Sequence, residues 1–246
     1  MAITIAHQGD PANHWGNTLE AFESAAVLGA DMVELDCKLT RDGHVVVLHD
    51  RTLARPWGIP RAVSALTWEE VSATRRHGYR VPRLAEVLDL VHLPVMVDVP
   101  SADVGEASLA VVEAAKAMAR CMFAGSTGAL VRMRQLTPAA RIALSWDKRQ
   151  LPPAELLANT RPEWFNPYFR LVTPRVVEQM HTAGLGVSAW TVDHRWDIRR
   201  VLRAGVDAII TNRTARLVSL LKTHRRKHSS ARLHPSRHSD QSPSGQ

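Results

Sequence analysis

The chain has 246 residues, of which 45% are hydrophobic and 22% charged, and its formal net charge is +7. These proportions are typical of a soluble globular protein, and the length suits one domain with a large core, such as an α/β barrel. Residues 223–246 carry five basic side chains and one acidic one, a net charge of +4, so only 7 − 4 = +3 remains for residues 1–222. The overall charge therefore does not by itself indicate a nucleic-acid-binding protein.

Residues 223–246 are also rich in serine and histidine and poor in large apolar side chains. Such a segment cannot bury enough apolar surface to offset the entropy lost on folding, so we expect a disordered, basic tail. A basic tail can contact nucleic acid or an anionic membrane, but a solvated tail is the simpler interpretation. We divide the chain into a folded domain, residues 1–222, and this tail, and we expect no nucleic-acid partner.

Several features bear on the compartment. Cys37 and Cys121 form neither a disulfide framework nor a zinc-binding spacing. The first residues lack the basic and long apolar regions of a signal peptide, and no run of about 18 apolar residues is present to span a membrane. We therefore expect a cytoplasmic protein, and the sequence leaves its oligomeric state open.

Short apolar runs alternate with segments of helical periodicity along the chain. Residues 3–6 predict a first strand, and Asn17 followed by Glu20 resembles a capping box for a helix that ends at Gly29. Residues 51–80 are irregular apart from a short helix beginning at Thr67. Further strands are predicted at 94–99, 120–124, 141–145, 164–166, 185–190 and 207–211, and further helices at 84–91, 103–118, 126–135, 153–160, 174–183 and 194–203, with a last helix ending near Lys222.

A β-hairpin is predicted directly after the first helix. Its first strand, residues 33–39, alternates apolar and polar side chains, as a half-buried strand does. Asp42-Gly43 predicts a two-residue type I′ turn, which pairs residues whose numbers sum to 85. Asp36 then lies opposite His49 and on the same face as Glu34, with paired Cβ atoms roughly 5 Å apart. A one-residue bulge would change this register, and a solvated hairpin with ordinary surface charges is the alternative.

The order of these elements predicts an α/β fold. Eight strand–helix units without a Gly-rich dinucleotide or P-loop fingerprint favour a (β/α)₈ TIM barrel over an open sheet. The hairpin and residues 51–80 then form a short insertion after the second barrel strand. Barrel enzymes place their chemistry at the carboxyl ends of the strands, and five candidate residues meet there. They are His7, Glu34, Asp36, His49 and Asp98.

The chemistry of these five side chains is that of a metal-assisted active site. Carboxylate oxygens are the ligands that Mg²⁺ and Ca²⁺ choose, and a neighbouring histidine can transfer protons. Each residue alone has an ordinary structural explanation, such as a hydrogen-bonded histidine at a strand end or, for Asp98, a helix cap. Their joint placement on successive strands favours an active site over separate structural roles.

Several short segments recur in the pattern of one known family. They are His7-Gln8-Gly9, Gly16-Asn17-Thr18, Gly29-Ala30-Asp31, Glu34-Leu35-Asp36, Thr40-Arg41-Asp42-Gly43, His49-Asp50, Val81-Pro82-Arg83-Leu84, Glu86-Val87-Leu88, Trp190-Thr191-Val192, Gly205-Val206-Asp207 and Ile210-Thr211. With these segments the chain resembles the glycerophosphodiester phosphodiesterases over about residues 3–217. The resemblance implies a (β/α)₈ barrel, one divalent metal ion, Mg²⁺ or Ca²⁺, and hydrolysis of a small-molecule glycerophosphodiester to glycerol 3-phosphate and an alcohol.

The resemblance also implies roles for individual residues. It places the metal ligands at Glu34, Asp36 and Asp98, the last where the family usually has glutamate, and the acid/base histidines at His7 and His49. The implied nucleophile is the glycerol 2-hydroxyl of the substrate, which gives a cyclic phosphate that water then opens. Trp190 either faces the glycerol or the leaving group, or only fills the barrel mouth.

Four positions depart from the family pattern. Gln8 replaces an arginine, Gly16 a glutamate and Pro100 a lysine, and Asn212-Arg213-Thr214 replaces Asp-x-Pro. Two phosphate-facing cations are thus missing, and three carboxylates around one divalent ion would repel an anionic substrate. The alternative to an active enzyme is therefore a non-catalytic or weakly active relative that binds a phosphodiester or a protein partner.

The missing charge requires another cation if the chain is an enzyme. We expect Gln8 and Trp190 to contact the substrate, and we favour Arg51 or Arg55 as the cation because both follow His49 closely in the chain. The other candidates at strand ends are Lys148, Arg170 and Arg213.

Overall fold

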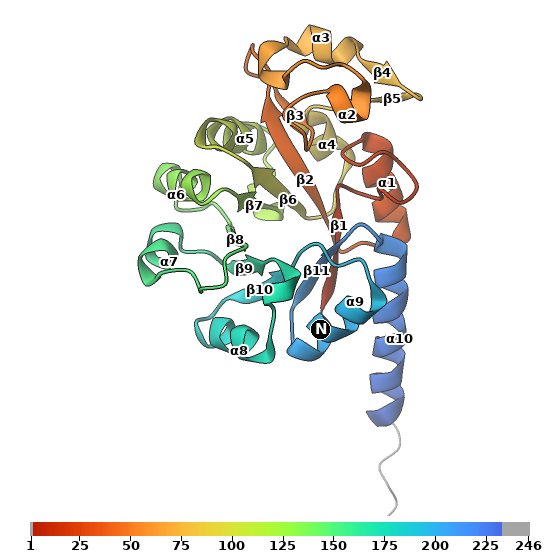
Figure 1. The fold of residues 1–246 in the computed structure, drawn as a ribbon, viewed down its shortest axis with the longest axis vertical. Coiled ribbons are helices and arrows are strands. Elements are labelled where there is room, and N and C mark those ends of the chain that lie inside the picture. The colour runs from red at the N-terminus through yellow and green to blue at the C-terminus, as the bar shows by residue number, and fades with distance from the viewer. Residues whose placement is uncertain (1, 233–246) are drawn as a thin grey trace, which may run out of the picture.

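The computed structural model describes residues 2–232, and the side chains of residues 2–223. Eight parallel strands form a nearly closed barrel with helices outside it, as predicted (Figure 1). The strands are β1 (Ile3–His7), β2 (Met32–Leu39), β6 (Val95–Val99), β7 (Cys121–Gly125), β8 (Ala143–Trp146), β9 (Trp164–Pro167), β10 (Gly186–Ala189) and β11 (Ala208–Thr211). They pair in the order β7-β6-β2-β1-β11-β10-β9-β8, and a parallel bridge between Phe123 and Ile142 links the two ends. The predicted TIM-barrel fold is confirmed.

The outer layer consists of helices that follow the barrel strands. They are α1 (Leu19–Leu28), α4 (Leu84–Leu90), α5 (Ala102–Ala114), α6 (Thr127–Leu136), α7 (Ala154–Thr160), α8 (Pro174–Thr182), α9 (Arg195–Ala204) and α10 (Thr214–Arg232), with the 3₁₀ turns η2 (Met118–Arg120) and η3 (Phe169–Leu171). Their bounds lie close to the predicted ones, except at the end of α10 and at the end of α5, which stops at Ala114 rather than at residue 118. No helix in the described part of the chain is both long and apolar enough to cross a membrane.

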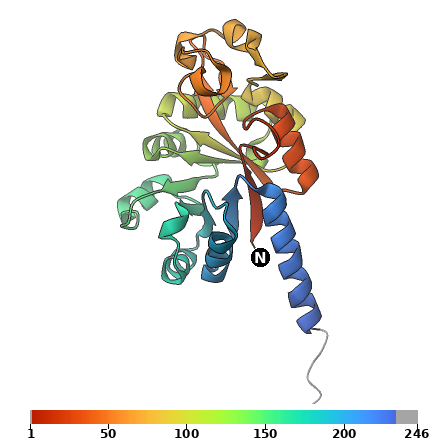
Figure 2. The same ribbon diagram turned by 45° about the vertical axis from the view of Figure 1, so that its right-hand side comes forward.

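Helix α10 lies beside α1 and continues past the packed part of the molecule (Figures 1 and 2). The predicted end near Lys222 is wrong, because the helix continues to Arg232. Neither glycine nor proline occurs between these two residues, so nothing in the backbone chemistry ends the helix there. The remainder of the segment predicted to be disordered, residues 233–246, lies outside the described residues.

The alternation of side chains in β2 connects the core to the site. Leu35 and Cys37 are fully buried and pack in the core between the barrel and the helices. Glu34 and Asp36 point the other way, since successive side chains of a strand lie on opposite faces. Deeper inside the barrel, Ile5, Met32, Met96, Met122 and Ile210 fill the interior. Apolar side chains therefore fill the barrel interior below the carboxylates.

The first helix begins one residue later than predicted. Thr18, not Asn17, is its N-cap, because the Thr18 hydroxyl accepts a hydrogen bond from the amide of Ala21. Asn17 has a φ of 63° and donates its side-chain amide to Asp36 instead. The predicted C-terminal glycine, Gly29, does end the helix in the left-handed conformation.

The hairpin between β2 and β3 (Val45–Val47) differs from the prediction by one residue. Its pairs are Cys37 with Val47 and Leu39 with Val45, so partner numbers sum to 84 rather than 85. The loop has three residues and contains one positive φ, at Gly43, in the geometry of a bulged turn. The predicted pairing of Asp36 with His49 is therefore wrong, and Leu48 lies opposite Asp36 instead.

The insertion after β3 forms a small subdomain beyond β2 (Figure 1, top). It comprises α2 (Ala54–Trp57), η1 (Val63–Ala65), α3 (Trp68–Ala73), β4 (Arg75–Arg76) and β5 (Tyr79–Arg80). The predicted helix start at Thr67 is confirmed, with a capping box between Thr67 and Glu70. Leu48, Leu53, Trp57 and Val71 form part of its separate apolar core.

Substituting the two glycines at the β7–α6 corner tests how closely the backbone packs at the barrel mouth. Gly125 has a φ of 115°, and a Cβ there would lie 2.2 Å from the carbonyl oxygen of Val99, whereas a Cβ at Gly128 meets nothing within 4 Å. Gly125→Ala should lower the free energy of unfolding by about 2 kcal/mol or more. Gly128→Ala, inside α6, should leave it unchanged or raise it by up to about 1 kcal/mol. Urea denaturation of both variants measures the difference, and equal effects would contradict it.

Candidate active site

A cavity of about 490 Å³ opens at the carboxyl ends of the barrel strands. It is lined by all five residues predicted to meet there, which are His7, Glu34, Asp36, His49 and Asp98. Strand register explains four of them, because Glu34 lies beside His7 on β1 and Asp36 beside Asp98 on β6. His49 reaches the same cavity although its predicted register is wrong, because β3 ends at Val47 and the chain turns away from the strand geometry.

The three carboxyl groups are close enough to repel one another. Burial, followed by repulsion from Asp36 and Asp98, raises the pKa of Glu34 well above its ordinary value. Burial and repulsion from Asp36 likewise raise the pKa of Asp98 to about 6. The ammonium of Lys38, on the same face of β2, opposes both shifts. The cluster thus holds more negative charge than its surroundings compensate.

Excess negative charge on oxygen ligands fits a hard divalent cation. Among the residues whose side chains are described, no three ligand side chains already enclose one point closely enough to hold an ion. They line a shared cavity instead. Asp36 Oδ2 accepts hydrogen bonds from Gln8 Nε2 and Asn17 Nδ2, both at 2.8 Å, which orients this carboxylate and leaves Oδ1 for other contacts. The three carboxylates therefore have the ligand type that a divalent cation prefers, but they are not arranged as a preformed coordination site.

The side chain of Gln8 occupies the space beside Gly16. A Cβ at position 16 would lie 2.8 Å from Gln8 Oε1 and 3.0 Å from Gln8 Cβ. A side chain at position 16 would therefore require the Gln8 side chain to shift. The glycine therefore permits the position of the glutamine.

His7 is held by a hydrogen bond from the loop that follows β11, the strand paired with β1. Its Nδ1 lies 2.7 Å from Asn212 Oδ1, and Asn212 Nδ2 donates to Asp193 Oδ2 at 2.9 Å. Because the Asp193 carboxylate can only accept, the Asn212 oxygen must face the histidine, and His7 Nδ1 must carry a hydrogen. The other ring nitrogen, Nε2, faces Glu34 at 3.8 Å and is the one available at the cavity.

His49 is held in a similar way by a carboxylate. Its Nδ1 lies 2.8 Å from Asp50 Oδ1, and Arg55 Nε donates to Asp50 Oδ2 at 2.7 Å. The hydrogen bonds from Arg55 hold the pKa of Asp50 well below its ordinary value, so Asp50 is an acceptor near neutral pH. Nδ1 of His49 is then the donor, and its Nε2 is also left unengaged.

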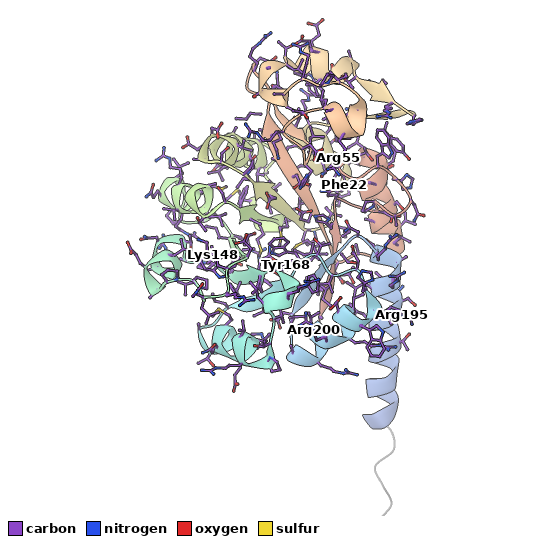
Figure 3. All side chains as sticks on the ribbon, in the orientation of Figure 1. Phe22, Arg55, Lys148, Tyr168, Arg195 and Arg200 are labelled. Atoms are coloured by element: carbon purple, nitrogen blue, oxygen red, sulfur yellow. The ribbon has the colours of Figure 1, made fainter. Side chains whose placement is uncertain are left out.

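The candidate cations lie in different places. Lys148, on the loop after β8, lines the main cavity, with Nζ 5.3 Å from the Trp146 ring. Arg55 lines a neighbouring cavity on the insertion side and is paired with Asp50, whereas Arg51 lines a third cavity together with Lys38. Figure 3 shows Lys148 and Arg55 on different sides of the barrel strands. The structure therefore does not bring Arg51 or Arg55 to the main cavity, and it does bring Lys148.

Trp190 lines the main cavity, and its indole nitrogen donates to the carbonyl oxygen of Asn166 at 2.8 Å. The sequence-based prediction missed four residues that support the site, namely Asn17, Lys38, Asp193 and Asn212. Lys38 was recognisable from the two-residue spacing, since it follows Glu34 and Asp36 on one face. Asn212 bonds to His7 of β1 from 205 residues later in the chain, and Asp193 bonds to Asn212, so no local sequence pattern predicts these contacts.

The comparisons with known proteins agree with this geometry. The model of the glycerophosphoryl diester phosphodiesterase family matches residues 7–216. The chain belongs to this family. A glycerophosphodiester phosphodiesterase from Caldanaerobacter subterraneus subsp. tengcongensis is 29% identical over 237 residues, which cover 89% of this chain and 98% of the relative.

Solved structures give the same fold. A Silicibacter pomeroyi protein assigned as a glycerophosphoryl diester phosphodiesterase matches with a TM-score of 0.82 and 26% identity, covering 90% of this chain and 94% of that one. An Oleispira antarctica phosphodiesterase, solved with its product sn-glycerol 3-phosphate, matches with a TM-score of 0.80 and 20% identity, covering 90% and 97%. The expectation that this chain is a phosphoric diester hydrolase of the glycerophosphodiester class is confirmed.

The raised pKa of Asp98 predicts how pH affects the metal-free protein. The folded state keeps a proton on Asp98 up to about pH 6, whereas the unfolded chain releases it near the ordinary value of 3.8. This carboxyl group therefore favours folding at low pH, and that contribution is lost as the pH rises from about 4 to about 6. In chelator, the parent should lose more unfolding free energy than Asp98→Asn across this window.

Urea denaturation at several pH values measures this difference between parent and variant. Mg²⁺ or Ca²⁺ should reduce it, because a bound cation stabilises the ionised carboxylate. Parallel pH curves for parent and variant in chelator would show that Asp98 does not titrate as described.

Proposed function

We propose that this chain hydrolyses glycerophosphodiesters to glycerol 3-phosphate and an alcohol by metal-dependent, two-histidine acid/base catalysis. The observation that carries the proposal is one cavity lined by three carboxylates and two histidines, whose Nε2 atoms make no hydrogen bond to any described residue. The glycerol 3-phosphate bound to the Oleispira antarctica relative supports the choice of product.

Glu34, Asp36 and Asp98 would hold one divalent cation, Mg²⁺ or Ca²⁺. When bound, it would polarise the phosphoryl oxygens and offset the negative charge that accumulates as the phosphorus is attacked. Gln8 and Asn17 orient Asp36 through its Oδ2 atom. These two amides fix the carboxylate without adding charge.

The histidines would move two protons. One Nε2 accepts the proton of the substrate's 2-hydroxyl as its oxygen attacks phosphorus, and the bond from phosphorus to the alcohol oxygen breaks. The other histidine, protonated at Nε2, donates that proton to the departing alkoxide. In the second step water opens the cyclic phosphate, and the protons return by the reverse transfers. The fixed Nδ1–H groups keep both rings oriented throughout.

The substrate's negative charge would be met by Lys148. Three carboxylates and one divalent cation leave a net charge of −1, and a phosphodiester adds another −1. Two such charges 4 Å apart repel by several kcal/mol at an effective dielectric constant of about 20. Lys148 lines the cavity and has no carboxylate partner among the described side chains. It replaces Arg51 and Arg55 as our candidate for this role.

Removal of a histidine or a ligand tests the catalytic assignment. His7→Ala and His49→Ala should each lower kcat by about 10²–10⁴-fold, because each removes one proton-transfer group. Glu34→Ala should abolish the metal-dependent rate while urea denaturation stays cooperative. The assay is release of glycerol 3-phosphate from a panel of glycerophosphodiesters with added Mg²⁺ or Ca²⁺. Full activity in excess chelator would rule out the metal.

The cation assignment needs its own comparison. Lys148→Met should raise KM about 10-fold, because it removes the charge that offsets the phosphodiester. Arg51→Met, at a side chain outside the main cavity, serves as the matched control and should leave KM unchanged. If Arg51→Met raises KM and Lys148→Met does not, the earlier expectation from the sequence was the better one.

A further inference from the structure

A second cavity, of about 360 Å³, lies between the insertion and the loop that follows β1. The side chains that matter for its chemistry are Trp15, Trp57, Arg55 and Arg76, and His49 forms part of its wall. The reaction proposed above does not use this cavity. Its position beside the main cavity suggests that it binds part of the substrate.

His49 connects the two cavities, because it lines both. Gln8 and Asn17 also line the second cavity, and both donate to Asp36, which lines the first. The two cavities are therefore adjacent and share the side chain of His49 as a common wall.

The wall of the second cavity is aromatic and cationic. Trp15 stacks on Tyr79 with ring centroids 5.7 Å apart, and Trp57 meets Trp15 edge-on at 5.3 Å. The guanidinium carbon of Arg76 lies 5.5 Å from the Trp15 ring. The buried indole nitrogen of Trp57 has no hydrogen-bond partner among the described residues.

The charges in this cavity do not cancel. Arg55 and Asp50 pair with each other through two hydrogen bonds, so their charges compensate. Arg76 donates only to the carbonyl oxygen of Pro56 and takes part in no ion pair within the side chains described. One positive charge is left facing the cavity.

This arrangement discriminates between two kinds of ligand. A cluster of tryptophan and tyrosine rings by itself suits a quaternary ammonium group. Here the protein's own guanidinium already lies over Trp15, so a cationic ligand would meet both an occupied ring and a like charge. An anionic group would instead pair with Arg76, and a planar guanidinium suits phosphate or carboxylate oxygens.

We propose that the second cavity binds the alcohol half of the substrate and selects an alcohol that carries an additional anionic group, with Arg76 as the recognition residue. The proposal rests on the proposed function, since it assumes a phosphodiester in the first cavity. The proposal also assigns one proton transfer to each histidine. The scissile alcohol oxygen then lies at the boundary between the cavities, next to His49, so His49 protonates the leaving alkoxide and His7 accepts the proton of the attacking hydroxyl.

Two substrates that differ by a single phosphate test this proposal. Glycerophosphoinositol 4-phosphate should be hydrolysed by the metal-loaded full chain with a kcat/KM about 10-fold above that of glycerophosphoinositol, the effect of one charge-assisted contact. Arg76→Met should remove most of this preference, lowering kcat/KM for the 4-phosphate substrate about 10-fold more than kcat/KM for glycerophosphoinositol. Arg75→Met is the matched control, because Arg75 lies next in the chain, bonds to the carbonyl oxygens of Ser72 and Thr74, and does not line the cavity.

The outcomes separate this inference from the proposed function. Equal kcat/KM values for the two substrates, a preference that survives Arg76→Met, or faster hydrolysis of glycerophosphocholine than of both would overturn the inference and leave the phosphodiesterase intact. Hydrolysis of no member of the glycerophosphodiester panel would refute the proposed function. In that case calorimetric binding of inositol 1,4-bisphosphate still decides the matter. Binding that Arg76→Met weakens and Arg75→Met does not supports the subsite, and no binding to the parent overturns it.

Discussion

The electrostatic repulsion among Glu34, Asp36 and Asp98 is the constraint on which the site depends. Buried carboxylates side by side are unfavourable unless donors or cations compensate them. The protein supplies two amide donors, from Gln8 and Asn17, and the ammonium of Lys38, which follows on the same strand face. This compensation is incomplete, as the raised pKa values of Glu34 and Asp98 show. The remaining charge makes the cluster receptive to a cation, and through the cation to a phosphodiester.

Two departures from the family pattern, Gln8 and Gly16, change the charge of the site less together than either would alone. The sequence alone suggested that replacing an arginine by Gln8 leaves the site short of positive charge. Gly16, however, stands where the family has a glutamate, so one positive and one negative charge are absent together and the local sum is unchanged. The two positions are also in contact in this structure, because a Cβ at position 16 would lie 2.8 Å from Gln8 Oε1. The argument for an inactive relative therefore loses much of its force.

The sequence predicted the features that depend on local backbone patterns, such as strand alternation and strand ends. The alternation in β2 placed Glu34 and Asp36 correctly, and strand-end positions identified His7 and Asp98. The hairpin register failed because Asp42-Gly43 also suits a bulged three-residue loop, in which only Gly43 needs a positive φ. Asn17 was taken for a helix cap because nothing local distinguishes it from Thr18. Its partner, Asp36, is nineteen residues away, and only tertiary structure brings the two together.

His49 shows how a wrong register still led to the right cavity. Leu48 packs in the apolar core of the insertion with Leu53 and Trp57, and this burial fixes the direction in which the next residue points. The same core supports Trp57, which lines the second cavity. One small hydrophobic cluster thus positions both His49 and part of the wall of the second cavity. Under the proposed mechanism, a change in insertion packing would alter proton transfer and the choice of leaving group together, whereas a change at Lys148 would alter phosphate binding.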